Sequence, residues 1–454
     1  MRCFARLTLT VLCLLPITAT IGAEKPNVLL ILADDLGFAD VGFNGCKDIP
    51  TPNLDALARS GVHCTQGYVS HPFCSPTRAG IMTGRYQQRF GHEMNPKYDP
   101  ADAISGLPLD QITLPQVLKQ NGYATGIVGK WHLGAHPQFH PNRRGFDEFF
   151  GFIGGGHTYF PTKTVGSPEY NVPIEFNGKD THETGYITTA FGREAAAFIE
   201  RHHADPWFVY LAFHAPHNPQ MAPEDYLQKF AAIADEKRRN YAAMVNAMDD
   251  AVGIVMAKLR ERKLEENTLV FFMSDNGGPV VINGSSNAPL RGAKGMVYDG
   301  GIHVPFLVRW KDHLPAGVDY TQPVISLDIF ATAVALADGK LPADRPMDSV
   351  NLLPYLTGKN TGVPHDLLHW RASGGERWAI RAGEQKLLLQ DGAVQMYDLG
   401  KDQGETTDIR SGNADAATKL QKMHDQWNTQ LVKPLFQSPV NERAAKKKAA
   451  KKKQ

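Results

Sequence analysis

Cys74 is the side chain of this sequence with the most evident capacity for chemistry. It stands in the stretch His71-Pro-Phe-Cys-Ser-Pro-Thr-Arg78, two residues before Pro76 and four before Arg78. Because proline suits the first turn of a helix, we expect Cys74 at a helix N-terminus, where backbone N–H groups favour an anion. Such a place suits a reactive group or a bound oxyanion. A cysteine that packs as a small hydrophobic residue beside a surface arginine is the simpler interpretation, and other segments must decide between the two.

Ionisable residues follow four aliphatic runs of the sequence. The run 28–33 is typical of a strand buried on both faces, and Asp34 and Asp35 follow it directly. Adjacent carboxylates repel each other and need a cation or a proton to coexist, although an Asp-Asp-x-Gly turn after a strand is common by itself. The other runs, 124–128, 207–213 and 269–273, lead to Lys130 and His132, to His214 and His217, and to Asp275 and Asn276. Because the carboxyl ends of strands in an open α/β sheet line one crevice, we expect these side chains in one site.

Two motifs resemble the signatures of the type I sulfatases, the formylglycine-dependent sulfatases of the alkaline-phosphatase superfamily. One is Cys74-Ser-Pro-Thr-Arg78 with the trailing Thr83-Gly84, and the other is Gly122-Tyr-Ala-Thr-Gly-Ile-Val-Gly-Lys-Trp-His-Leu-Gly134. The likeness extends from about Asn27 to about Asp408. It implies an α/β fold in which helices sandwich a large, mixed, mostly parallel sheet, with a smaller C-terminal α+β subdomain made of an antiparallel sheet and a helix. It also implies an arylsulfatase-like enzyme that hydrolyses sulfate monoesters of a carbohydrate.

The resemblance implies that Cys74 is the precursor of the nucleophile. In this family a separate formylglycine-generating enzyme oxidises the motif cysteine to Cα-formylglycine (3-oxoalanine). The gem-diol formed by its hydration attacks sulfur to give a sulfated enzyme, and deprotonation of the second hydroxyl then expels sulfate. The family ion is calcium, which prefers hard oxygen ligands, whereas zinc prefers nitrogen and sulfur. The implied ligands of one Ca²⁺ ion are Asp34, Asp35, Asp275, Asn276 and the group derived from Cys74.

The resemblance also assigns roles to the other polar residues. Asp275 is expected to take the first proton, and His132 is the expected base for sulfate elimination. The expected contacts to the diol come from Arg78 and Lys130, and those to the sulfate oxygens come from Lys294 and His217, one of which would protonate the leaving alcohol. Four residues are candidates for the substrate rim: His157 and Tyr159 in a glycine- and aromatic-rich loop, together with His214 and Arg291. The chain departs from the family pattern at Asp299 and His303, where the family usually has Glu and Arg.

Changes in composition along the chain suggest its domain boundaries. Residues 1–23 combine two arginines, an apolar run and a small-residue end, which is the pattern of a secretory signal peptide, so we expect export to the periplasm or the extracellular space. The catalytic domain is expected at 24–350 and the C-terminal subdomain at 351–437. Residues 438–454 include two lysine triplets and are expected to form a disordered basic tail. The strongest helical pattern is 239–263, and shorter helices are expected at 54–60, 114–120 and 414–431.

Composition argues against nucleic-acid binding and against a membrane span. The net charge is +1, and the arginines of the leader and the lysines of the tail leave the folded body mildly acidic. No later apolar run approaches the roughly 18 residues that a span requires. If Cys74 is converted, Cys46 and Cys64 remain in the exported protein, and the sequence leaves open whether they form a disulfide.

Two other functions fit parts of this pattern. A formylglycine-dependent phosphonate monoester hydrolase or phosphodiesterase would use the same motif with a transition metal. A non-catalytic protein that binds sulfated glycans would keep the fold without the reaction. Export, the glycine-aromatic loop and the lack of a lipid-binding segment favour a sulfated carbohydrate as the substrate. The sugar, the sulfated position, the choice between exo and endo cleavage, and the oligomeric state stay open.

Overall fold

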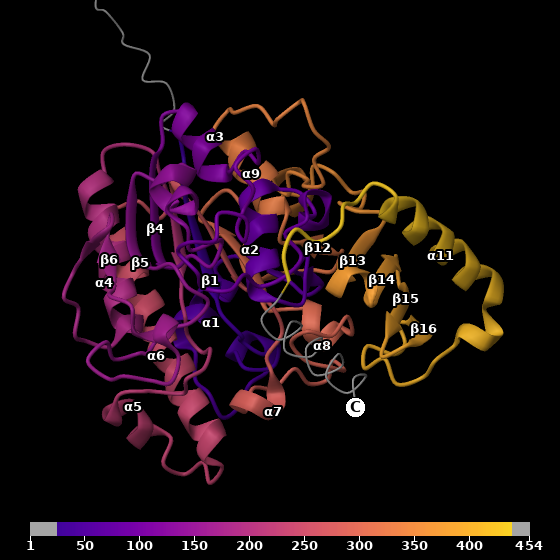
Figure 1. Cartoon of the computed structure of the whole chain (residues 1–454), viewed down its shortest axis with the longest axis horizontal. Helices are drawn as coiled ribbons and strands as arrows, with labels where there is room; N and C mark the ends of the chain where they lie inside the picture. Colours follow the sequence, from indigo (N-terminus) through magenta and orange to yellow (C-terminus); the bar gives the residue numbers. More distant parts are fainter. Residues whose placement is uncertain (1–24, 438–454) are drawn as a thin grey trace, which may run out of the picture.

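The computed structural model describes residues 25–437, which are built around one large sheet (Figure 1). Its strand order is β11-β2-β10-β9-β1-β8-β4-β5-β6-β7. The bounds of these strands are β1 Asn27–Ala33, β2 Val62–Cys64, β4 Ala124–Lys130, β5 Glu148–Phe152, β6 Glu175–Phe176, β7 Lys179–Asp180, β8 Trp207–Ala212, β9 Thr268–Ser274, β10 Phe306–Trp310 and β11 Val318–Tyr320. The predicted signal peptide and basic tail lie outside the described residues.

The centre of the sheet is parallel, as the aliphatic runs predict. Strands β9, β1, β8, β4 and β5 run in one direction, and β10 pairs antiparallel with β9. In register, Ala33 at the end of β1 lies opposite Ser274 at the end of β9, and Leu32 lies opposite Ala212 at the end of β8. The carboxyl ends of the central strands therefore share one edge, where their polar residues meet.

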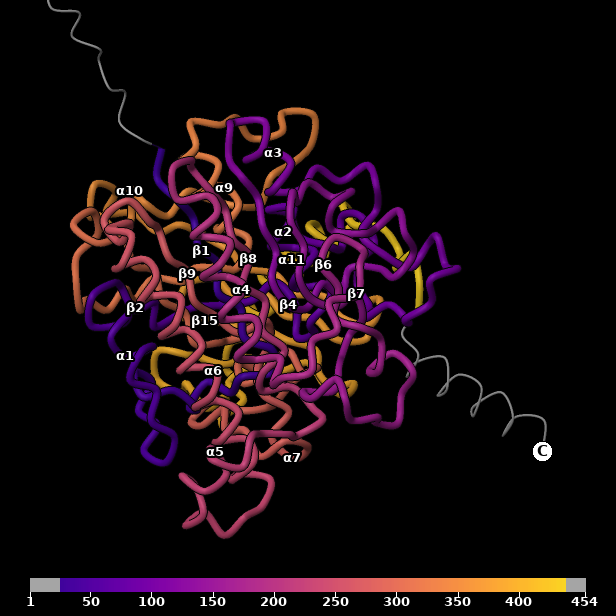
Figure 2. Tube along the Cα trace, turned by 90° about the vertical axis from the view of Figure 1, so that its left-hand side faces the viewer, coloured from indigo at the N-terminus to yellow at the C-terminus, as the bar shows by residue number. Residues whose placement is uncertain are grey.

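Each face of the sheet is covered by helices, and the alternation along β1 shows why the strand is apolar throughout. Val28, Leu30 and Leu32 pack into one core cluster, whereas Leu29 and Ile31 pack into the other. The first cluster includes residues of α2 (Cys74–Thr83), α3 (Leu114–Gln120) and α9 (Asp328–Leu336), and the second includes residues of α1 (Pro52–Arg59), α4 (Ile187–His202) and α6 (Glu236–Glu261). Figures 1 and 2 show α4 and α6 on one side of the sheet and α2 and α9 on the other.

Helix α6 confirms the strongest helical pattern but starts three residues earlier than predicted. The Asp235 carboxylate caps it by accepting a hydrogen bond of 2.7 Å from the Arg238 amide. On its buried face, Asp249 accepts hydrogen bonds from the Asn53 and Leu54 amides at 3.0 and 2.8 Å, so this carboxylate caps α1. None of the helices in residues 25–437 is long and apolar enough to cross a membrane.

The C-terminal part has the predicted antiparallel sheet and helix. Strands β13 (Leu368–Ala372), β14 (Arg377–Ala382), β15 (Gln385–Gln390) and β16 (Ala393–Asp398) form a meander, and α11 (Ala414–Asn428) covers one face of it (Figure 1). Residues on the opposite face, Trp370 and Leu388 among them, pack into the core cluster that contains α2. This subdomain is therefore continuous with the catalytic core.

Candidate active site

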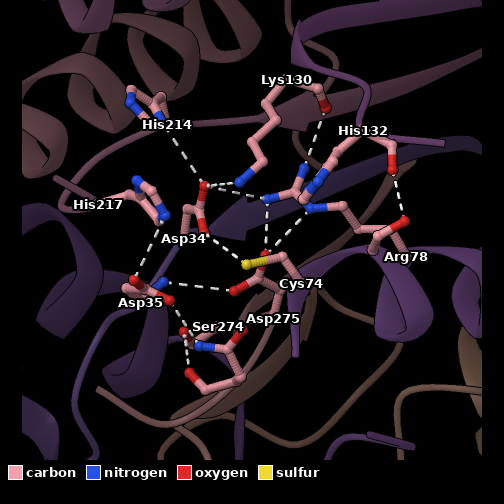
Figure 3. Close-up of polar contacts among 12 residues, drawn as sticks. Asp34, Asp35, Cys74, Arg78, Lys130, His132, His214, His217, Ser274 and Asp275 are labelled. Atoms are coloured by element: carbon pink, nitrogen blue, oxygen red, sulfur yellow. Dashed lines mark hydrogen bonds and ion pairs between the residues drawn. The ribbon is translucent and has the colours of Figure 1, made fainter. Parts of the chain in front are cut away.

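Cys74 is the first residue of α2, which confirms the prediction of a cysteine at a helix N-terminus. The preceding Phe73 has extended backbone, and the Asn95 side chain accepts a hydrogen bond of 3.1 Å from the Ser75 amide. The Cys74 side chain is buried but does not lie in apolar surroundings. Its Sγ is 3.4 Å from Asp34 Oδ1 (Figure 3). It also lies 3.1 Å from Lys294 Nζ.

The carboxylates and the amide predicted at the strand ends come together below Cys74. Asp34 and Asp35 follow β1, while Asp275 and Asn276 follow β9. The Asn276 Nδ2 donates to Asp35 Oδ1 at 2.7 Å, and the Asp35 amide donates to Asp275 Oδ1 at 3.3 Å. All four side chains are at most 3% exposed, so their charges are largely removed from water and require partners.

Three cations supply those partners, and two of them, Arg78 and Lys130, are fully buried. Lys130 Nζ lies 2.5 Å from Asp34 Oδ2, and Lys294 Nζ lies 2.6 Å from Asp35 Oδ1. Arg78 donates through Nε and Nη2 to Asp275 Oδ2 at 3.0 and 2.8 Å, and its Nη1 donates to the Lys130 carbonyl. Each carboxylate thus has its own cation, which accounts for the spacing between Cys74 and Arg78 on one helix turn.

These contacts set the protonation of the site. Burial alone would raise the pKa of Asp34, but the charge of Lys130 leads a group of opposing interactions that hold it well below the ordinary value. The pKa of Asp275 is raised to about 7, first by burial and then by repulsion from Asp34. The pKa of Lys294 is well above its ordinary value because nearby negative charge, led by Asp35, outweighs the effect of burial. The site therefore holds fixed charges of both signs in a dry environment.

Two site residues have a backbone conformation that side chains other than glycine seldom adopt. Asp35 has φ of 66° and His132 has φ of 59°, and both stand just past the end of a central strand. The His132 amide donates to the Ile153 carbonyl at 3.0 Å, and its carbonyl accepts from the Ser75 hydroxyl at 2.5 Å. Such strained positions persist where surrounding contacts fix them, and they are concentrated at functional sites.

The histidines occupy different depths. His217 Nε2 lies 3.7 Å from Asp35 Oδ2, and its side chain is 14% exposed, so it can meet a ligand. His214 lies deeper, with Nδ1 at 3.5 Å from Asp34 Oδ2. Burial lowers the pKa of His132, and the charges of Lys130 and Arg78 add to the effect. Burial also lowers the pKa of His217, and the opposing charges of Asp34 and Asp35 do not cancel this effect. Both rings are therefore neutral at neutral pH and keep one nitrogen free to act as a base.

The donor set suits a hard divalent cation. Asp34, Asp35, Cys74 and His217 each offer one ligand atom within 4.8 Å of the others. The Asn276 Oδ1 is buried and has no hydrogen-bond partner among residues 25–437, so an oxygen remains available for a cation. Carboxylate and amide oxygens predominate, as calcium requires. The residues present therefore fit the ion that the sequence predicts.

Three of the four predicted rim residues are not at the rim. His157, Tyr159 and His214 are at most 1% exposed, so their predicted contact with substrate is wrong. The Tyr159 hydroxyl donates to the carbonyls of His214 and His217 at 2.9 and 2.8 Å, and His214 Nε2 bonds the His157 backbone. The glycine-aromatic loop folds back under the histidines and braces them. Arg291 is exposed, but it bonds Tyr397 of the C-terminal sheet.

Several residues of the site belong to no recognisable motif and were not predicted from the sequence. Asn95 caps the helix that carries Cys74, and the Tyr210 hydroxyl on β8 accepts from Arg78 at 3.4 Å. Side chains alternate between the two faces of β8, so Tyr210 lies on the same face as Phe208. This alternation is the one feature of the sequence that indicates the face on which Tyr210 lies. Asp299 and His303, the departures from the family pattern, lie away from Cys74. Asp299 bonds Tyr68 and Lys386 at the boundary with the C-terminal sheet.

Comparison with known proteins identifies the class to which this fold and site belong. The family model for Sulfatase matches residues 26–339. N-acetylgalactosamine-6-sulfatase of Mus musculus is 35% identical over 85% of this chain and 76% of its own length. Arylsulfatase J of Mus musculus is 35% identical over 85% of this chain and 65% of its own length. The chain belongs to the sulfatase family, and its reaction is the hydrolysis of sulfate esters.

A solved structure shows how far the likeness extends. The crystal structure of Ps i-CgsB in complex with k-i-k-neocarrahexaose superposes with a TM-score of 0.88 at 38% sequence identity. The match covers 93% of this chain and 96% of the other, so it includes the C-terminal sheet and helix. The large mixed sheet with its small C-terminal sheet is thus the alkaline-phosphatase-like fold that the sequence predicts.

Proposed function

We propose that this sulfatase removes sulfate from a sulfated carbohydrate, with a formylglycine derived from Cys74 as the nucleophile and Ca²⁺ as the bound ion. The observation that carries this proposal is the position of Cys74 between Asp34 Oδ1 and Lys294 Nζ, at 3.4 and 3.1 Å. The choice of a carbohydrate is supported by the relatives, one of which is named for N-acetylgalactosamine 6-sulfate and another of which was solved with a neocarrahexaose.

The absent groups would supply two chemical functions. The hydrated aldehyde would carry two hydroxyl groups. One would serve as the nucleophile, and the other would allow sulfate to leave without attack of water on sulfur. A calcium ion held by Asp34, Asp35, Asp275, Asn276 and the residue at position 74 would stabilise negative charge on the sulfate oxygens.

The protein's own residues prepare the pocket for an anionic ester. Lys294 and His217 stand at its mouth and are placed to contact sulfate oxygens, and one of the two would pass a proton to the departing alcohol. Arg78 holds Asp275 in one orientation, from which the carboxylate can take a proton. Lys130 neutralises Asp34, and His132 offers a neutral ring nitrogen as the base for the second half of the reaction.

We also propose that the chain is exported and matured by a formylglycine-generating enzyme. Support comes from the signal-peptide pattern of residues 1–23 and from the intact Cys-Ser-Pro-Thr-Arg motif. Intact-protein mass tests maturation, because conversion of a cysteine to formylglycine lowers the mass by about 18 Da.

The central test replaces Cys74 in the full chain. Cys74→Ala should lower turnover of an aryl sulfate and of sulfated saccharides by at least about a thousandfold, because it removes the precursor of the nucleophile. Inorganic sulfate release is the measurement, and circular dichroism checks the fold. Cys46→Ala is the matched control, because Cys46 is also a free cysteine but is only half-buried and bonds Asp48 outside the site. Near-normal hydrolysis by Cys74→Ala would refute the proposed nucleophile, and turnover of a phosphodiester in preference to every sulfate ester would refute the proposed substrate.

A further inference from the structure

A triplet of glycines brings an acidic side chain next to the active centre. A Cβ atom on Gly155 would lie 2.5 Å from His132 Nε2, and one on Gly154 would lie 2.8 Å from Glu169 Oε1. A side chain at either position would have to displace the His132 ring or the end of Glu169, so the two glycines let the loop pass close to both. His132 and Glu169 line one small cleft beside the charged centre.

Backbone amides, and no side chain in residues 25–437, donate hydrogen bonds to Glu169. Its Oε1 accepts from the Gly155 amide, and the Gly156 amide also donates to the carboxylate. Burial raises the pKa of this carboxyl, because the charged form has lost part of its hydration. Burial raises the pKa of the Tyr98 and Tyr170 phenols, and the charge of Glu169 adds to the effect. Tyr98 lines the same cleft as Glu169, and a half-buried carboxylate beside an aromatic ring has the composition of a sugar subsite, where a ring covers C–H faces and the carboxylate accepts from hydroxyls.

The size of the space limits what can enter. The cleft is lined by Pro96, Lys97, Tyr98, His132, Gly134, Ala135, Ile153, Gly154, Gly155 and Glu169, and its volume is about 10 Å³. That is the space of one water molecule or one hydroxyl group, and a sulfate group is several times larger. The ammonium of Lys97 lies 3.6 Å from Asp99 Oδ2, so its charge has a partner of its own.

We propose that Glu169 determines specificity by accepting a hydrogen bond from a free hydroxyl of the sugar next to the sulfate ester, and that the cleft rejects a second sulfate at that position. This inference rests on the proposed function, since it assumes that a sugar follows the sulfate into the site. A buried group built to bond a hydroxyl discriminates strongly, because a substrate without that hydroxyl leaves the group unpaired. Like charge and lack of room act together against a vicinal disulfate.

The experiment compares the matured, calcium-loaded enzyme with Glu169→Gln on three matched saccharides. The substrates differ only at the position next to the sulfate ester, which carries a free hydroxyl, hydrogen in a deoxy sugar, or a second sulfate. For the wild type we expect kcat/KM to fall at least about tenfold on the deoxy sugar and further on the disulfate. For Glu169→Gln we expect about a tenfold loss on the hydroxyl substrate, little change on the deoxy sugar, and a relative gain on the disulfate.

The controls separate this inference from the proposed function. Glu224→Gln makes the same charge change on the exposed helix α5 (Glu224–Lys229) and should leave all three values unchanged. An aryl sulfate, which has no neighbouring hydroxyl, should be hydrolysed equally by wild type and Glu169→Gln. An equal loss by Glu169→Gln on the hydroxyl and deoxy sugars, or efficient cleavage of the disulfate by the wild type, would overturn the role of Glu169 alone. Aryl sulfate turnover without release of sulfate from any saccharide would overturn the carbohydrate proposal and this inference with it.

Discussion

At the scale of single residues, the site is a balanced set of buried charges. Three carboxylates, those of Asp34, Asp35 and Asp275, face three cations, those of Arg78, Lys130 and Lys294. Burying an ion is costly unless it is paired, and removing one partner leaves the other uncompensated. A divalent cation would add positive charge to this balance, which favours an anionic ester as the ligand. The pairing explains how so many ions can share one dry pocket.

The unpartnered oxygen of Asn276 gives a direct test of the ion. We expect that a calcium chelator abolishes sulfate release and that added Ca²⁺ restores it. In Asn276→Ala the lost oxygen should raise the Ca²⁺ concentration for half-restoration by at least about tenfold, because each oxygen ligand contributes to affinity. The measurement is activity as a function of free Ca²⁺, with the exposed Asn360→Ala as the control. Full activity in a verified metal-free sample would contradict the role of the ion.

Sequence could predict which strand ends converge, but it could not predict the depth of each side chain there. Parallel strands must place Asp34 and Asp275 at one edge, so residue type and strand position were sufficient. His157 and Tyr159 occupy a loop without a period, and whether such a loop faces solvent or folds under the site depends on contacts distant in sequence. For the same reason Glu169, which follows the glycines by more than ten residues, carried no recognisable signal.

At the scale of elements, two helices of the same layer are tied together by a side chain of one that caps the end of the other. Asp249 in the middle of α6 accepts from Asn53 and Leu54 and so supplies the first turn of α1 with acceptors. Burial raises its pKa to about 6. The sequence shows that Asp249 lies on α6 and that a proline begins α1. Only the packing of the two helices shows that the Asp249 carboxylate caps α1. The cap fixes where α1 begins, at Pro52, two residues before the predicted start.

Removing this cap should destabilise the protein without changing its chemistry. Asp249→Ala is expected to lower the free energy of unfolding by about 1–3 kcal/mol, because the buried amide of Leu54 and the part-buried amide of Asn53 lose their acceptor. Chemical denaturation measures the loss, and kcat of the folded enzyme should stay the same. Asp250→Ala is the neighbouring control, since that carboxylate is half exposed and bonds Tyr226 of α5. Equal losses in the two variants would show that Asp249 does not act as a cap.

At the scale of the whole molecule, the C-terminal sheet is part of the frame that holds the site. The Trp370 indole donates to the Val69 carbonyl at 2.7 Å, and the stretch that carries Cys74 begins two residues later, at His71. Lys386 of β15 lies between Asp299 and Glu405, and the Gly300 amide next to Asp299 donates to the Arg291 carbonyl. The departures from the family pattern therefore lie in the contact between sheet and core. Composition changes near residue 352, which indicates a boundary between the catalytic domain and the C-terminal subdomain. It could not show that these two parts share a hydrophobic core.

The chain that joins the two parts contains a titratable contact whose effect on stability has a definite sign. His365 Nε2 lies 2.8 Å from Asp328 Oδ1, and that carboxylate also accepts from the amides of Ile325 and Val350 at 2.9 Å each. Burial alone would lower the pKa of His365, but the Asp328 carboxylate outweighs it and raises the pKa above 6.5. The folded state thus holds this proton more tightly than the unfolded chain. Its contribution is complete below about pH 6.5 and is lost as the pH rises through the raised value.

His365→Gln should therefore lower the free energy of unfolding most at low pH. We expect it to lower the free energy of unfolding by about 1–2 kcal/mol at pH 6, since a charged hydrogen bond to a buried carboxylate is replaced by a neutral one. The difference from the wild type should shrink steadily at higher pH, where the wild-type imidazole also becomes neutral. Denaturant titrations at several pH values measure this difference in the free energy of unfolding. The control is His313→Gln at an exposed histidine, for which we expect the difference from the wild type to be the same at each pH. A difference for His365→Gln that is independent of pH would mean that His365 is neutral in the folded protein, and the contact between α9 and the joining segment would then depend on packing rather than charge.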